Sequence, residues 1–126
     1  MTIRIARHTS NLELITEFYT KVIGLEILGS FQDHDGYNGV FLGKAGLSWH
    51  LEFTQSAQPP RHIFDEDDLL VFYPETAEAY EAMLRRMKDQ HVQSLPAKNP
   101  YWNANGILLK DPDGYGVVLS GLRASK

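Results

Sequence analysis

The sequence contains no cysteine among its 126 residues. This absence excludes disulfides, thiol nucleophiles and thiolate metal sites, and it is consistent with a reducing compartment. No apolar run approaches the roughly 20 residues that span a bilayer, and the N-terminus lacks the apolar segment of a signal peptide. We therefore expect a cytoplasmic protein that does not enter a membrane.

Positive charge is also scarce. Lys and Arg number 12 against 16 Asp and Glu, so the formal net charge is −4. This balance argues against nucleic acid or an anionic membrane as the main partner. The composition, 43% hydrophobic and 22% charged, is that of a globular protein. The length predicts one domain, residues 1–126.

An internal repeat is the most informative feature of the chain. Residues 1–55 predict a strand, a helix and three strands, and residues 67–122 predict the same order after a Pro-containing linker, residues 56–66. The repeat predicts an α+β fold in which two paired βαβββ modules form a half-open, barrel-like concave sheet with helices on the outside. The concave side would be free to hold a ligand.

Two local expectations complete this pattern. A capping box of Ser10 and Glu13 predicts the start of the first helix, and Gly24 predicts its end. In the second half, residues 91–95 are expected to form a short strand and residues 96–104 a loop.

Alternation in the strand 47-LSWHLEF-53 separates two faces. Leu51 and Phe53 fall on the apolar, helix-packed face, whereas His50 and Glu52 fall on the other. By the same parity, Arg4 and His8 of the first strand should also face the cavity. A buried carboxylate requires a positive partner, so we expect Arg4 to hold Glu52 or Asp68, the alternative being a solvated surface pair.

Three stretches carry a resemblance to a known superfamily: 10-SNLELITEFYTKVIGLEIL-28, 47-LSWHLEF-53 and 111-DPDGYGVVLS-120. In combination they resemble the vicinal oxygen chelate superfamily, which includes glyoxalase I, the bleomycin- and fosfomycin-resistance proteins and the extradiol dioxygenases. The stretch 99-NPYW-102 before the DPDGY turn resembles a glyoxalase-like subgroup.

The resemblance implies a metal site built from His and Glu side chains. Its four positions fall at Arg4, Glu52, Asp68 and Val118. Arginine has no acceptor and valine has no polar atom, so two of the four positions cannot bind a cation. We therefore expect the metal site to be lost and no cofactor to be needed.

A metal site of a different composition is the alternative. Glu52 and His50, joined by Asp68 or His8, would offer carboxylate and imidazole ligands to Ni, Zn, Mn or Fe. Each histidine has a simpler interpretation as a side chain satisfied by hydrogen bonds, and His50 could instead serve as a general base.

Tyr101 and Trp102 also have two interpretations. They could close the end of the barrel, or they could form an aromatic wall for a planar or apolar ligand.

Two functions follow from these residues. The preferred one is a glyoxalase/bleomycin-resistance-like protein that binds a small, partly aromatic or apolar molecule without a metal. Its candidate ligand-binding residues are Arg4, His8, His50, Glu52, Tyr101 and Trp102. The alternative is a metal-dependent lyase, isomerase or dioxygenase that acts on vicinal oxygens. A pure interaction module would lack a cavity. The resemblance also implies a homodimer with a shared cavity.

Overall fold

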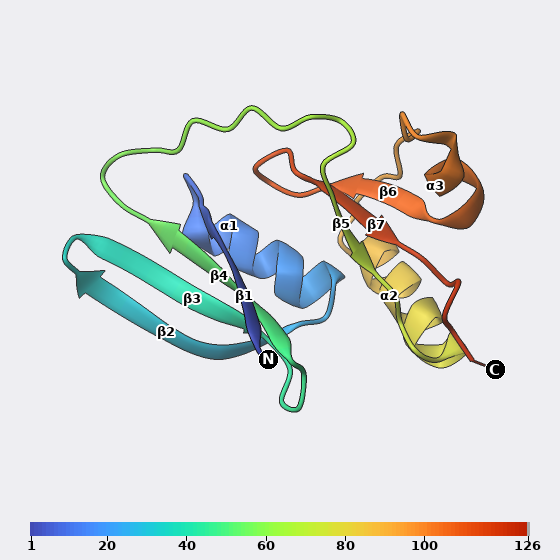
Figure 1. The fold of residues 1–126 in the computed structure, drawn as a ribbon, viewed down its shortest axis with the longest axis horizontal. Coiled ribbons are helices and arrows are strands. Elements are labelled where there is room, and N and C mark those ends of the chain that lie inside the picture. Colours follow the sequence, from blue (N-terminus) through green and yellow to red (C-terminus); the bar gives the residue numbers. More distant parts are fainter. Residues whose placement is uncertain (126) are drawn as a thin grey trace. The chain divides into compact units, whose positions relative to one another are not determined.

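Residues 1–125 are described by a computed structural model in which the chain forms two units, residues 1–62 and a second unit that begins at Ile63. Each unit has its own small, open sheet with helices, of four strands in the first and three in the second (Figure 1). The α+β class predicted from the repeat is confirmed. No helix among residues 1–125 is long and apolar enough to cross a membrane.

The first unit has the predicted order of one strand, a helical segment and three strands. Its sheet is ordered β1-β4-β3-β2, with β1 and β4 parallel and the other pairs antiparallel. The elements are β1 (Ile3–His8), α1 (Leu12–Glu17), η1 (Phe18–Val22), β2 (Glu26–His34), β3 (Tyr37–Gly43) and β4 (Trp49–Gln55).

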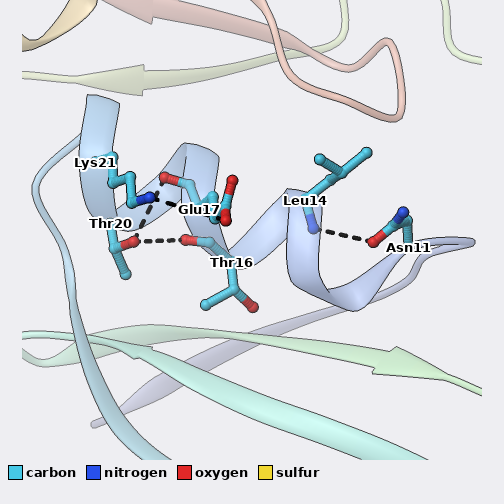
Figure 2. A network of polar contacts seen from close by, with 6 residues as sticks. All are labelled: Asn11, Leu14, Thr16, Glu17, Thr20 and Lys21. Atoms are coloured by element: carbon cyan, nitrogen blue, oxygen red, sulfur yellow. Dashed lines mark hydrogen bonds and ion pairs between the residues drawn. The ribbon is translucent and has the colours of Figure 1, made fainter. Parts of the chain in front are cut away.

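The helical segment starts one residue later than predicted and changes pitch halfway. Asn11, not Ser10, is the N-cap, because its Oδ1 accepts a hydrogen bond from the Leu14 backbone N–H at 3.0 Å (Figure 2). After Glu17 the segment widens into the π-helical turn η1, in which Ile23 N donates to Phe18 O at 3.3 Å.

Threonine hydroxyls accompany this change of pitch. Thr16 Oγ1 donates to the backbone oxygen of Leu12. Thr20 Oγ1 donates to the backbone oxygen of Thr16 at 2.8 Å (Figure 2). Such side-chain bonds compete with the regular helical ladder and often bend helices. Gly24, at φ 89°, terminates the segment as predicted.

The core of the first unit lies between this helical segment and one face of the sheet. The wider π turn brings Phe18, Tyr19, Val22 and Ile23 onto one buried face. Tyr19 is fully buried, and its ring stacks on Phe53 of β4 at 5.1 Å between centroids. Leu42, Leu51 and Ile15 complete the buried layer.

The second unit also pairs its first and last strands in parallel. Its sheet is ordered β5-β7-β6, with the β6–β7 pair antiparallel. The elements are β5 (Leu69–Phe72), α2 (Ala77–Asp89), α3 (Pro100–Asn105), β6 (Ile107–Lys110) and β7 (Gly116–Leu119).

Two local predictions for the second unit are wrong. Residues 91–95 form no strand and contribute a single bridge, Leu95 to Leu108. Pro96 follows directly and has no N–H to extend the pairing. Within the predicted loop 96–104 the chain forms α3, because Asn99 Oδ1 caps the Tyr101 N–H at 3.0 Å and Pro100 takes the first helical position.

Candidate functional site

One face of the first unit's sheet packs against α1 and η1; we call the opposite side the open face. The register pairs Arg4 with His50 and Ala6 with Glu52, and Phe41 of β3 also pairs with Glu52. Side chains in register share a face. The predicted alternation in β4 is therefore confirmed, since Leu51 and Phe53 are buried while His50 and Glu52 are half-buried.

Arg4 reaches across β4 on the open face. Its Nε donates a hydrogen bond to His50 Nε2 at 2.9 Å. Its guanidinium carbon lies 4.7 Å from the centroid of the Phe41 ring on β3, a cation–π distance. The structure thus gives Arg4 a different partner from the carboxylate of Glu52 or Asp68 that the sequence predicted. The reason is register, which places His50 directly beside Arg4.

In this contact the Arg4 Nε–H donates and the ring nitrogen Nε2 of His50 accepts. The accepting nitrogen carries no negative charge. The contact therefore orients the guanidinium without neutralising its charge.

Glycines make room for aromatic rings on the same face. Gly39 is buried because the Phe31 ring lies over it, and a Cβ at position 39 would overlap that ring. Phe31 lies 5.8 Å from Phe41, and Phe41 lies 6.2 Å from His50, between ring centroids. We call Phe31, Phe41 and His50 the aromatic floor. Phe31 and Phe41 were not predicted as site residues from the sequence, although a glycine opposite an aromatic residue in paired strands is a recognisable signal.

His8 has a structural role on the open face. Its Nδ1 lies 2.8 Å from Thr54 Oγ1, and its Nε2 lies 3.0 Å from the backbone oxygen of Gln58. His62 Nε2 also donates to the backbone oxygen of His8 at 2.7 Å. Both ring nitrogens of His8 are therefore engaged, and together with the bond from His62 these contacts hold residues 56–62 of the predicted linker against β1.

Tyr101 and Trp102 lie on α3 in the second unit. Their rings meet edge to face at 4.9 Å between centroids. Tyr101 is exposed, whereas Trp102 is half-buried and lies 3.3 Å from the place where a Cβ of Gly106 would lie. Within the second unit, Trp102 therefore packs on the start of the closing hairpin, and Tyr101 is the ring with surface available to a ligand.

Asp68 and Val118, the other two positions implied by the superfamily, also belong to the second unit. Asp68 Oδ2 accepts a hydrogen bond from the backbone N–H of Asp65 at 3.1 Å, which closes the turn before β5. Val118 is fully buried in β7, in register with Val71 and Leu108.

The residues at the implied metal positions do not fit a divalent cation. Arg4 presents only donors, Val118 presents only carbon, and His50 Nε2 already accepts from Arg4. Among residues 1–125, no group of three or more His, Asp or Glu side chains is placed to hold a metal ion. On the open face, the Arg4 guanidinium lies over the Phe41 ring and beside the His50 imidazole.

The exposure of Arg4 leads to a prediction about stability. Replacing Arg4 with leucine is expected to change the free energy of unfolding by less than about 1 kcal/mol, because an exposed hydrogen bond contributes little. Urea unfolding followed by circular dichroism measures this. A loss of several kcal/mol would indicate that Arg4 instead neutralises a buried carboxylate.

Comparison with known proteins places the chain in a family. Residues 3–54 match the YycE-like N-terminal domain, and residues 67–121 match the YycE-like C-terminal domain. The uncharacterized protein YycE of Bacillus subtilis (strain 168) is 40% identical over 120 residues, which cover 92% of this chain and 84% of that protein.

Solved structures agree with this assignment. A crystal structure of a YycE protein of unknown function from Bacillus subtilis has a TM-score of 0.83 at 36% identity, and the match covers 99% of this chain and 90% of that chain.

Two more distant structures share the fold. The trypanothione-dependent glyoxalase I of Leishmania major has a TM-score of 0.71 at 21% identity, with 95% and 85% of the two chains covered. TnmS3, an antibiotic binding protein from Streptomyces sp. CB03234, has a TM-score of 0.66 at 18% identity, with 95% and 93% covered. The chain belongs to the YycE-like family, within the vicinal oxygen chelate superfamily of glyoxalases and antibiotic-resistance proteins.

Proposed function

We propose that this protein binds a small, partly aromatic or apolar molecule against the aromatic floor, without a resident metal. The proposal rests on one observation: the aromatic floor lies beside the Arg4 guanidinium. Rings on a rigid sheet offer a preorganised apolar surface, and a few polar groups orient what binds there. The fold shared with an antibiotic binding protein supports a binding function.

The charged groups of the open face complete this site. Arg4 supplies hydrogen-bond donors, and the Glu52 carboxylate, in register with Phe41, adds a negative charge to the same face. Separately, in the second unit, the exposed ring of Tyr101 on α3 is a candidate ligand contact of that unit. We propose that the protein acts in the cytoplasm as a homodimer, and light scattering tests the dimer directly.

A metal-dependent, glyoxalase-like enzyme is the second candidate. The fold shared with a glyoxalase I favours it, and Glu52 and His50 lie on neighbouring positions of one strand face. Few ligands support this function, since Nε2 of His50 already accepts a hydrogen bond from Arg4.

Metal analysis separates the two functions. Protein purified without chelator and then titrated with Ni²⁺ or Mn²⁺ is expected to hold well under one equivalent of metal, because too few ligands converge. Inductively coupled plasma mass spectrometry measures the ratio, with Glu52→Gln as the matched variant. One metal ion per chain that disappears in Glu52→Gln would establish the enzyme's metal site and contradict the proposal.

A further inference from the structure

The guanidinium of Arg4 has one edge engaged and one edge available. Nε is held by His50, and within residues 1–125 the terminal nitrogens Nη1 and Nη2 make no hydrogen bond. The side chain is exposed, so these nitrogens are accessible. A guanidinium edge with two parallel N–H groups matches the two oxygens of a carboxylate or phosphonate.

The available edge is also oriented. The Nε bond to His50 at 2.9 Å and the Phe41 ring at 4.7 Å hold the plane of the guanidinium at two points. Neither contact neutralises it, since neither the accepting imidazole nitrogen nor the Phe41 ring carries a negative charge. An oriented, uncompensated cation loses less side-chain entropy on binding an anion than a free arginine would.

The residues around Arg4 indicate the chemistry of the part of the ligand that Arg4 does not bind. Phe41 lies under the guanidinium, and Phe31 extends the apolar surface on the adjacent strand. An oxyanion bound to Arg4 would therefore carry its ring or apolar group onto the aromatic floor. Resting on the proposed function, we infer that the ligand is a small molecule with a carboxylate or phosphonate attached to a planar, apolar group.

The Glu52 carboxylate would repel a bound anion, so its replacement tests whether the ligand is negatively charged. It lies on the same face, in register with Ala6 and Phe41, and it has no ion pair within residues 1–125. A carboxylate there repels a bound anion. Removing its charge should strengthen anion binding while leaving a neutral ligand unaffected, which is the opposite of what loss of a polar contact would do.

The experiment compares 1-naphthoate with its neutral counterpart 1-naphthamide. Each is titrated into ¹⁵N-labelled protein at low ionic strength, and amide shifts of the open face report binding. Wild-type protein is expected to bind naphthoate roughly 10-fold or more tightly than naphthamide. Arg4→Gln should remove that preference, and Glu52→Gln should increase it. Arg61→Gln, a change of the same kind in the exposed part of residues 56–62, should alter neither affinity.

The possible results distinguish failure of the anion site from failure of the proposed function. Equal binding of both compounds, or a preference that survives Arg4→Gln, would overturn the anion site while leaving the proposed apolar ligand in place. Weaker naphthoate binding by Glu52→Gln would show that Glu52 contacts the ligand, and it would also overturn the anion site. Binding of neither compound at millimolar concentration would overturn both proposals. The spectra themselves establish whether each variant is folded.

Discussion

Replacing Val118 with glutamate, the residue that the superfamily carries at this position, is expected to destabilise the protein by about 3–5 kcal/mol. The Val118 side chain is 0% exposed to solvent, and its neighbours across the sheet are the apolar residues Val71 and Leu108. Its Cγ1 would lie 2.6 Å from a Cβ at Gly106, so the space around it is already filled. A carboxylate there is both desolvated and overpacked.

Urea unfolding of Val118→Glu measures this cost, and Val118→Gln is the matched control. Glutamine has the same shape without the charge, so the difference between the two variants isolates the charge. Burial raises the pKa of an introduced carboxyl, so the added penalty should be largest at neutral pH and shrink as the pH falls. Rescue of the glutamate variant by Ni²⁺ or Mn²⁺ would show that the other ligands of a metal site persist.

Replacing Phe53 with alanine is expected to cost about 3–5 kcal/mol of unfolding free energy. Phe53 is buried on the helix-packed face of β4, and its ring stacks on Tyr19 at 5.1 Å. The alanine variant leaves a cavity between the sheet and η1 that neither element can collapse to fill without moving its backbone. Circular dichroism during urea unfolding provides the measurement.

Phe31→Ala is the matched control from the open face. Phe31 is half-buried and covers Gly39 without entering the core. Its removal is expected to cost only about 1 kcal/mol, in proportion to the apolar area lost, but to weaken binding of an aromatic ligand. Similar stability losses for the two variants would mean that both sheet faces are equally buried, and the open face would not be a binding surface.

The periodic parts of the first unit could be predicted from the sequence. Alternation in β4 correctly separated His50 and Glu52 from Leu51 and Phe53, because a strand has only two faces. The partner of Arg4 could not be predicted in this way. The partner of Arg4 depends on the register between β1 and β4, whose paired residues lie 46 positions apart in the sequence. A shift of the register by one residue would place a different side chain beside Arg4.

The aromatic floor was missed for a different reason. Each strand considered alone predicts that Phe31 and Phe41 are core residues, because phenylalanine is usually buried. Only the pairing of Phe31 with Gly39 shows that the ring lies over a glycine on the open face. In the second unit, the cap signals of Asn99 and Pro100 were present, but two bulky aromatics and a proline favoured a loop.

The pairing of Phe31 with Gly39 restricts how this surface can evolve. Any side chain at position 39 would occupy the space of the Phe31 ring, so a substitution there must be accompanied by loss or displacement of the aromatic at position 31. Neither change alone is expected to keep the aromatic surface intact. A larger residue at position 39 would displace the Phe31 ring, and a small residue at position 31 would expose the backbone of Gly39 to solvent. Relatives that use this face for a different ligand should therefore differ at both positions together.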